Sequence, residues 1–282
     1  MRNGNNPSVG KELRDYPRLV VSAIVHLPHM SGYHAHRLEV VKTSLRLMVE
    51  RMNADAFVQI WDNGSCAEMR NWLEHELKPD MLVLSSNVGK QNARTSIFGM
   101  WPTNTVVACA DDDMFYYPNW LNPQLELLDH FPNVGVVSGY PCRTSFRWGN
   151  KHTLAWAHAH AAEVRTGRFL PDEWERDFAV SIGRDPDFHM GEYTAKDVDT
   201  IIRYKGKEAY ATSHHCQFVG VAGRVLPCTK FVNRLMGSES NFDVAIDDAG
   251  LLRLCTTERL TRHIGNVLDN QFIEKIKEYA YA

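Results

Sequence analysis

Residues 19–25 read Leu-Val-Val-Ser-Ala-Ile-Val, a short and continuous apolar run rich in β-branched side chains. Such a run is typical of a strand that is buried on both faces of a sheet. From residue 38 to residue 52, apolar residues recur at the three-and-four spacing of one helical face. A second strand is predicted over residues 56–61, which completes a β-α-β unit.

The alternation of strands and helices continues along the chain. Helices are predicted over residues 67–77 and 90–100, and strands over residues 81–84, 105–109 and 134–140. This order predicts an α/β fold, a Rossmann-type, mostly parallel sheet with helices on both faces.

After residue 140 the pattern changes to a stretch rich in Trp, His, Arg and Asp, which predicts a region inserted over the sheet as far as residue 215. Residues 172–187 lack helical or strand periodicity and are predicted to form a loop. A helix is predicted over residues 249–254 and a strand over residues 260–264. We therefore divide the chain into an N-terminal tail (1–17), an α/β half (18–140) and a second half that completes the same domain (141–282).

The composition excludes several classes of protein. The chain has 31 Lys plus Arg against 34 Asp plus Glu, and this balance argues against a nucleic-acid partner held by phosphate contacts. No apolar run is long enough to span a bilayer and no secretory signal is recognised, so a cytoplasmic location is expected. The six cysteines form no C-x-x-C pair, and His214 and His215 are adjacent, so no zinc cluster or disulfide framework is predicted.

Polar side chains follow three of the predicted strands. Asp62 follows the second strand, Asn87 the third, and the run Asp111-Asp112-Asp113 the fourth. Because ligands of open α/β sheets bind beyond the carboxyl ends of the strands, these side chains are expected to converge on one site. Mg²⁺ and Mn²⁺ prefer carboxylate oxygens, with substrate phosphates and water in the remaining positions. An acidic turn that caps a following helix is the alternative reading of the three aspartates.

Five elements in this order resemble the GT-A glycosyltransferases, particularly family 2. They are the segments Asp62-Asn63-Gly64-Ser65, Asn87-Val88-Gly89 with Arg94, Asp111-Asp112-Asp113, Asp247-Asp248 and Arg262-His263-Ile264-Gly265-Asn266. The resemblance covers roughly residues 19–266 and implies a GT-A-like fold in which residues 18–140 bind the nucleotide sugar and the inserted region lies on the acceptor side.

The resemblance also assigns roles toward the donor. It implies that Asp62 contacts the base, that Asn87 and Gly89 lie near the nucleotide, and that Arg94 comes from the following helix. The D-x-D signature matches Asp111 and Asp113, with Asp112 between them beside the donor. Asp113 is the expected direct ligand of Mn²⁺ or Mg²⁺, with Asp111 and His263 as further candidates. Arg224, in the segment Gly220-Val221-Ala222-Gly223-Arg224, is a candidate to pair with phosphate.

The implied reaction is a metal-dependent, inverting transfer from a nucleoside-diphosphate sugar to an acceptor hydroxyl. The acceptor must lose a proton as it attacks, which requires a carboxylate base. Asp248 is the candidate, with Asp247 beside it, and the alternative is that both cap a helix. His263 has the alternative of an ordinary packed histidine, and residues 220–224 that of a plain turn.

Other functions stay open. A nucleotidyltransferase shares the sheet and the acidic metal site, but such an enzyme usually has a basic, glycine-rich loop after the first strand. The corresponding loop here, residues 26–32, has no Lys or Arg. A hydrolase can use the same cation with water as acceptor, and a non-catalytic nucleotide- or sugar-binding protein can keep the fold. The nucleotide, the sugar, the acceptor and the oligomeric state cannot be predicted from the sequence.

Overall fold

We describe the protein from a computed structural model. The structure describes residues 16–237, 239–268 and 272–274, together with residues 4, 7, 9 and 10. Most of the predicted N-terminal tail, residues 1–17, therefore lies outside the described residues. None of the helices in the described part of the chain has the length and apolar character that a membrane crossing requires.

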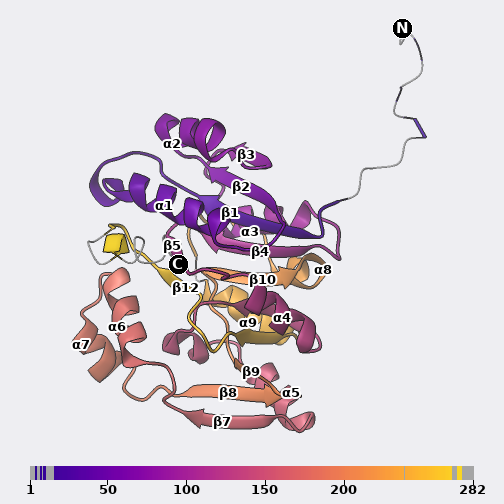
Figure 1. Cartoon of the computed structure of the whole chain (residues 1–282), viewed down its shortest axis with the longest axis vertical. Helices are drawn as coiled ribbons and strands as arrows, with labels where there is room; N and C mark the ends of the chain where they lie inside the picture. The colour runs from indigo at the N-terminus through magenta and orange to yellow at the C-terminus, as the bar shows by residue number, and fades with distance from the viewer. Residues whose placement is uncertain are drawn as a thin grey trace.

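Within the described residues, the strands form a ten-stranded sheet and a separate two-stranded ribbon (Figure 1). The order across the large sheet is β3 (Met81–Ser85), β2 (Phe57–Asn63), β1 (Leu19–Val25), β4 (Val106–Asp111), β10 (Gln217–Val221), β6 (Val134–Ser138), β11 (Leu252–Cys255), β9 (Lys207–Tyr210), β8 (Asp199–Tyr204) and β7 (Glu163–Gly167). The ribbon pairs β5 (Met114–Tyr116) with β12 (Thr261–His263).

The sheet is mixed, with its parallel part where the sequence predicts it. Strands β3, β2, β1 and β4 pair in parallel, and β6 pairs in parallel with β11. Strand β10 runs antiparallel between β4 and β6, and β9 and β7 are antiparallel to their neighbours. The carboxyl ends of β1, β2 and β4 consequently lie along one edge of the sheet.

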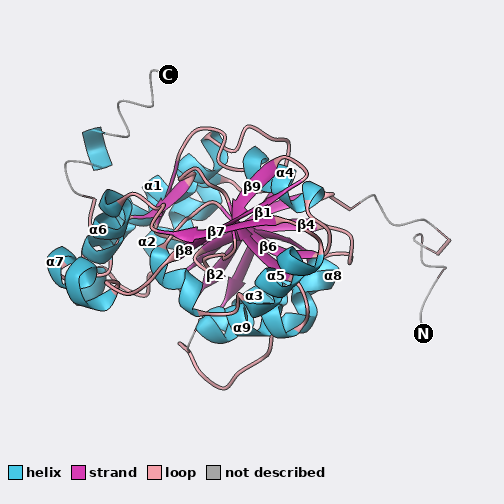
Figure 2. Cartoon of the chain, turned by 90° about the horizontal axis from the view of Figure 1, so that it is seen from below, coloured by secondary structure: helices cyan, strands magenta, loops and turns pink. Residues whose placement is uncertain are grey.

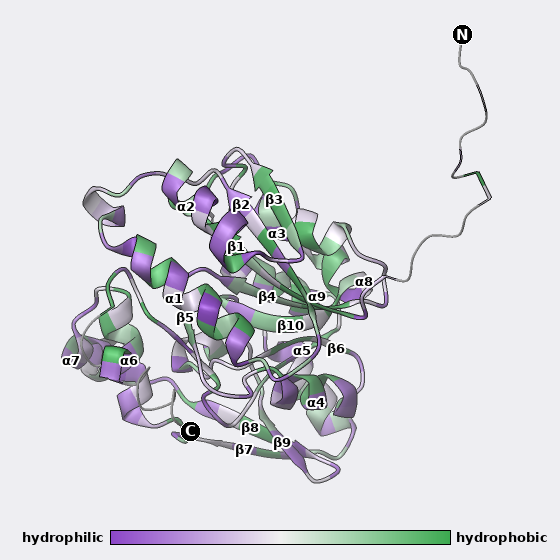
Figure 3. Cartoon of the chain, turned by 45° about the horizontal axis from the view of Figure 1, so that its top comes forward, coloured by the Kyte–Doolittle hydropathy of each residue, from purple (hydrophilic) through white to green (hydrophobic). Residues whose placement is uncertain are grey.

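Helices cover both faces of the sheet (Figure 2), as predicted. Residues of β1 alternate between two hydrophobic cores, with Val21 and Ala23 in one and Val20 and Ile24 in the other. The first core includes residues of α1 (Arg37–Glu50), α2 (Ala67–Trp72) and α4 (Asn122–His130). The second includes residues of α3 (Lys90–Gly99), α8 (Ala222–Val225) and α9 (Ser240–Asp248). Figure 3 shows the hydrophobic residues concentrated in the strands between them.

The inserted region contains more regular structure than predicted. Residues 172–187, predicted as a loop, instead form α6 (Asp172–Ser181) and the start of α7 (Pro186–Phe188). That prediction was wrong because Glu175 and Ala179, one turn apart, are the residues that α6 buries, and a charged side chain on the inner face hides the periodicity. The other elements here are η3 (Arg143–Arg147), α5 (Lys151–Ala159) and η4 (His189–Tyr193).

The helix predicted over residues 249–254 is also wrong. Helix α9 ends at Asp248, and Gly250 takes a left-handed conformation with φ of 71° just after it. Residues Leu252–Cys255 are all buried as strand β11 beside β6. The remaining short elements are η1 (Gly32–His34), η2 (Leu73–Leu77) and η5 (Leu226–Cys228).

The pairing of β10 with its neighbours β4 and β6 gives a test of the fold. A Cβ atom on Gly220 would lie 2.6 Å from the Gly135 carbonyl oxygen and 2.6 Å from Val225 Cγ2. We expect Gly220→Ala to lower the free energy of unfolding by about 1–3 kcal/mol, because the carbonyl oxygen of Gly135 belongs to the backbone and can move aside only with a shift of the strand. Gly191→Ala is the control, since nothing lies within 4 Å of its added Cβ. Equal denaturant midpoints for the two variants would contradict this packing.

Candidate active site

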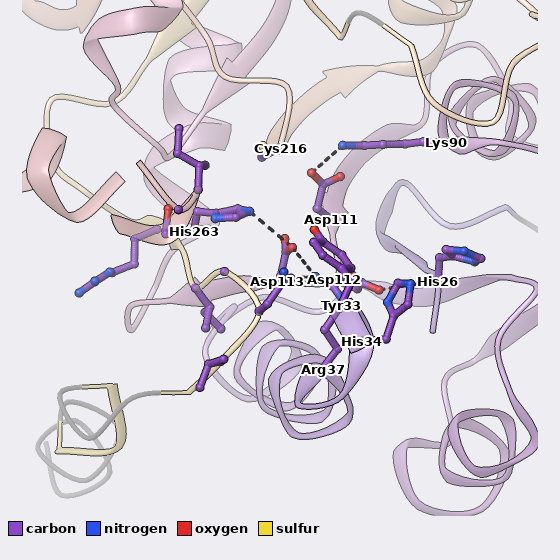
Figure 4. A pocket seen from close by; sticks show the side chains of 18 of the residues that line it. His26, Tyr33, His34, Arg37, Lys90, Asp111, Asp112, Asp113, Cys216 and His263 are labelled. Atoms are coloured by element: carbon purple, nitrogen blue, oxygen red, sulfur yellow. Dashed lines mark hydrogen bonds and ion pairs between the residues drawn. The ribbon is translucent and has the colours of Figure 1, made fainter. Parts of the chain in front are cut away.

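A cavity of about 1200 Å³ opens at the carboxyl ends of β1, β2 and β4 (Figure 4). Side chains from distant parts of the sequence line it, and they fall into three groups. The loop after β1 and the start of α1 contribute the first, the strand ends and α3 the second, and α6, α9 and β12 the third. The polar members used below are His26, Arg37, Asn63, Asn87, Lys90, Asp111, Asp112, Asp113, Asp177, Glu239 and His263.

Two basic side chains form ion pairs with the three consecutive aspartates. Lys90 Nζ lies 2.7 Å from Asp111 Oδ2. Arg37 reaches both of the others, with Nη1 3.0 Å from Asp113 Oδ2 and Nη2 paired to Asp112 Oδ1. The backbone N–H of His26 donates to the second oxygen of Asp112 at 3.0 Å. Because adjacent carboxylates repel, these partners allow the run to remain mostly buried at the end of β4.

The surroundings shift the pKa values of this cluster in opposite directions. Burial raises the pKa of Asp113, but His263 and Arg37 outweigh it and hold the pKa well below its usual range. Burial prevails at Asp112, whose pKa is raised despite Arg37. Burial lowers the pKa of His263, but neighbouring Asp113 outweighs it, so the net shift is upward. Asp113 is therefore held more firmly in its ionised form than Asp112.

The structure brings together two of the predicted metal ligands. His263 Nε2 lies 3.4 Å from Asp113 Oδ2. Among the described residues, Asp113 Oδ1 and His263 Nδ1 are buried polar atoms without a hydrogen-bond partner. A buried oxygen and nitrogen left without partners cost free energy unless a ligand satisfies them. Asp111 instead turns toward Lys90 and Cys216 (Figure 4).

The predicted donor residues have mixed outcomes. Asn87 lines the cavity and receives a hydrogen bond from Asn63 at 3.1 Å. Asp62 does not line it: its two oxygens accept from the backbone N–H of Ser65 and from Arg70 Nε, and the residue is fully buried. The contact of Asp62 with the base stays a prediction, and Asn63 is the residue of that turn that faces the cavity.

Gly89 and Arg94 lie behind the residues that line the cavity. Gly89 has φ of 89°, and an added Cβ would lie 2.4 Å from the Arg234 carbonyl oxygen, so glycine lets the segment before α9 approach α3. Arg94 is buried, and its Nη2 lies 2.8 Å from Glu239 Oε2. Neither residue lines the cavity, so the structure does not support their predicted contact with the nucleotide.

Arg224 lies at the edge of the sheet opposite to the cavity. Strand β10 starts beside Ala110 and ends beside Val106, so residues 220–224 emerge at the amino-terminal end of β4. Arg224 Nη1 donates there to the Val134 carbonyl at 3.0 Å. The antiparallel direction of β10, which its apolar pattern does not reveal, places Arg224 away from the cavity.

The predicted base pair Asp247-Asp248 is also outside the cavity. Both residues end α9, where Asp247 Oδ1 accepts a 2.8 Å hydrogen bond from the backbone N–H of His152 and Asp248 is exposed. The cavity is instead lined by Glu239, at the opposite end of the helix. The predicted helix starts at residue 249, whereas α9 begins at Ser240, and this places the pair at the end of the helix that is away from the cavity.

Sequence reasoning therefore missed three charged residues of the site. Glu239 lies 4.0 Å from Lys90 Nζ, so one lysine joins it to Asp111. The other two are Lys90 itself, the first residue of α3, and Arg37, the first residue of α1. The signal in the sequence for Arg37 and Glu239 was a charged residue at the start of an amphipathic helix. Many helices without a functional role share that pattern, so it could not single out these two residues.

Comparison with known proteins bears on this arrangement. The profile described as Glycosyl transferase family 2 matches residues 39–185, which is more than half of the chain. The chain belongs to glycosyl transferase family 2. The family match and the mixed α/β sheet confirm the predicted GT-A-like fold. Among curated proteins, no relative matches this family 2 chain.

Three solved structures resemble this family 2 chain at low sequence identity. A mannosyltransferase from Pyrobaculum calidifontis, in complex with GDP-Man and Mn²⁺, has 20% identity and a TM-score of 0.34 over 43% of this chain and 35% of its own. Residues 1–349 of S. aureus TarS give 9% identity and 0.49 over 88% and 60%. GalNAc-T7 with UDP, GalNAc and Mn²⁺ gives 10% identity and 0.49 over 89% and 44%. The family 2 chain thus spans less than two thirds of each of these proteins.

The pairing of Glu239 with two cations predicts a pH dependence of stability. Burial raises the pKa of Glu239, but Arg94 and Lys90 outweigh it and bring the pKa from 4.5 to about 2. Glu239 therefore contributes stability that is fully present above about pH 4.5 and is lost as the pH falls through about 2. We expect Glu239→Gln to cost about 3 kcal/mol near neutral pH and almost nothing near pH 2.

Denaturant unfolding of the two proteins between pH 7 and pH 2 measures this difference. Glu173→Gln, at an exposed position of α6, is the control. The difference in unfolding free energy between this variant and the parent should not change with pH. A stability gap between Glu239→Gln and the parent that stays constant down to pH 2 would exclude the ion pairs as its cause.

Proposed function

We propose that this chain transfers a sugar, with inversion, from a nucleoside-diphosphate sugar to an acceptor hydroxyl and depends on a divalent cation. One observation carries the proposal. The partnerless buried atoms Asp113 Oδ1 and His263 Nδ1 belong to residues in mutual contact that line a cavity of about 1200 Å³. Mixed carboxylate and imidazole donors suit Mn²⁺, and carboxylates suit Mg²⁺. The family supports the choice of reaction.

Asp113 and His263 would hold the cation, with Asp111 as a further carboxylate of the cluster. When bound, Mn²⁺ or Mg²⁺ supplies Lewis-acid stabilisation to the departing diphosphate. Arg37 and Lys90 already stand beside the aspartates and add two fixed positive charges to the same region. Such preorganised charges stabilise a developing negative charge without further rearrangement.

The donor would lie against the first half of the domain, residues 18–140. His26, Asn63 and Asn87 line that side of the cavity and offer amide and imidazole groups to a nucleotide. The second half, residues 141–282, supplies α6 and α9 to the other side, where the acceptor would enter. UDP, GDP and dTDP donors all remain compatible with these groups.

Glu239 is the proposed base. The Lys90 ammonium group contacts both Glu239 and Asp111, which places this carboxylate close to the acidic cluster. In the reaction, the acceptor oxygen forms a bond to the anomeric carbon while the bond from that carbon to the diphosphate oxygen breaks. The hydroxyl proton passes to a Glu239 oxygen, and the electron pair leaves with the diphosphate. Arg94 keeps Glu239 in place from the buried side.

Nucleotide binding tests the cation site directly. We expect one of UDP, GDP or dTDP to raise the unfolding midpoint only when Mn²⁺ is present, since saturation at 100 times the dissociation constant adds about 2.7 kcal/mol. Asp113→Asn should abolish the Mn²⁺-dependent part of the shift. Asp177→Asn is the matched control, because Asp177 lines the same cavity but pairs with Arg259. An Asp113→Asn variant with an undiminished shift would contradict the proposed ligand.

Turnover distinguishes the two carboxylate positions of α9. Glu239→Gln should lower kcat by about 10²- to 10⁴-fold, because the glutamine amide cannot accept the acceptor proton. Asp248→Asn should leave kcat unchanged, since Asp248 is exposed at the other end of the helix. Product analysis with and without acceptor separates transfer from hydrolysis. A large loss in Asp248→Asn with full activity in Glu239→Gln would restore the pair at the end of α9.

A further inference from the structure

Three consecutive side chains form a second group of donors beside the cavity. His214, His215 and Cys216 lie in the segment between β9 and β10, and one donor atom from each lies within 4.8 Å of the others. A smaller cavity of about 230 Å³ is lined by all three and by Asp243 and His263. His215 and Cys216 also line the large cavity, so the group lies between the two spaces.

A buried carboxylate orients the middle residue of the group. His215 Nδ1 lies 2.9 Å from Asp243 Oδ2, and the other oxygen of Asp243 lies 2.8 Å from Arg253 Nη2. This pairing favours the tautomer with the proton on Nδ1, which leaves the lone pair of Nε2 for a ligand. A carboxylate that holds the far nitrogen of an imidazole is the usual support of a metal-bound histidine.

The other two members of the group, His214 and Cys216, differ in how readily they reach a ligating form. Burial, followed by the neighbouring His215 and His263, lowers the pKa of His214, so its ring is neutral and has a free lone pair. The Nδ1 atom of His214 accepts only a long hydrogen bond, 3.3 Å, from the backbone N–H of Cys216. Burial and the nearby Asp111 raise the pKa of the Cys216 thiol, so its thiolate would form only where a bound cation offsets the cost of the buried negative charge.

The donor types set which cation fits. A thiolate with two imidazoles suits Zn²⁺, whereas Mg²⁺ and Mn²⁺ prefer oxygen. Zinc bonds of about 2.0–2.3 Å place tetrahedral donors about 3.5 Å apart, so the group needs to close by about 1 Å. Three protein ligands leave a fourth position for water or a substrate atom, as in open zinc sites. Asp111 lies close enough to interact with the Cys216 thiol, beside Lys90, which pairs with the same carboxylate.

We propose that His214, His215 and Cys216 form a Zn²⁺ site that is separate from the carboxylate site at Asp113, with Asp243 as its positioning residue. The inference does not depend on the proposed transfer reaction, because it concerns a different donor set. The sequence did not predict this site, because adjacent histidines rarely bind one zinc ion unless a turn directs both rings to one point.

Metal binding to the full chain, without a polyhistidine tag, tests the proposal. Dialysed protein should retain one equivalent of Zn²⁺, and Co²⁺ in its place should give the ultraviolet absorption of a thiolate-to-Co²⁺ charge transfer. Cys216→Ser should remove that absorption and the bound Zn²⁺. Cys66→Ser is the matched control, because Cys66 is the other half-buried free cysteine of the described residues. Asp243→Asn should weaken Zn²⁺ binding by about 10- to 100-fold.

Asp113→Asn separates the two cation sites. It should keep the Zn²⁺ equivalent and the Co²⁺ spectrum while it loses the Mn²⁺-dependent nucleotide response. His215→Gln, at a partly exposed ring, gives a second loss-of-site variant if Cys216→Ser folds poorly. Zinc retained by both Cys216→Ser and His215→Gln overturns the proposal, as does zinc lost from Asp113→Asn but not from Cys216→Ser. In the second case zinc binds at the carboxylates instead.

Discussion

Three carboxylates in a row at the end of a buried strand must each find a positive or hydrogen-bonding partner. Bringing such charges out of water is costly, and their mutual repulsion adds to the cost. The partners come from separate parts of the chain, with Arg37 at the start of α1, Lys90 at the start of α3, and His263 on β12. Compensation of this charge therefore ties two helices and the small ribbon to the edge of the central sheet.

From Asp111, charges of alternating sign continue into the interior toward α9. Lys90 contacts Asp111 and Glu239, and Glu239 contacts Arg94, which packs against the ring of Phe242 at 4.9 Å. Buried ion pairs are weak evidence for net stability, because desolvation cancels much of their attraction. What they do secure is position, since each charged atom is restrained by the next. The start of α9 is thus fixed relative to the acidic cluster by charge and by packing together.

The inserted region depends on a second buried network. Arg143 Nε lies 3.0 Å from Asp199 Oδ1, and His189 Nε2 lies 3.0 Å from Glu175 Oε2, with all four side chains inaccessible or nearly so. Asp199 also accepts from the backbone N–H groups of Phe169 and Leu170, just before α6. These contacts hold α6 over the cavity, where Asp177 pairs with Arg259 and Arg262. A helix with so polar an inner side cannot be distinguished from a charged loop by hydrophobic spacing.

The sequence by itself determined the α/β core and the place of the acidic run. The apolar pattern of residues 19–25 and the polar residues that follow successive strands are local signals, and parallel strands bring their carboxyl ends to one edge. Only the tertiary structure decided which charged residues face the cavity. Asp62 accepts a hydrogen bond from its own turn, Asp247 accepts one from the sequence-distant backbone N–H of His152, and Arg224 is carried to the far edge by the antiparallel β10. Glu239 and Arg37 enter the site because ion pairs across the fold, which leave no periodic trace in the sequence, hold them there.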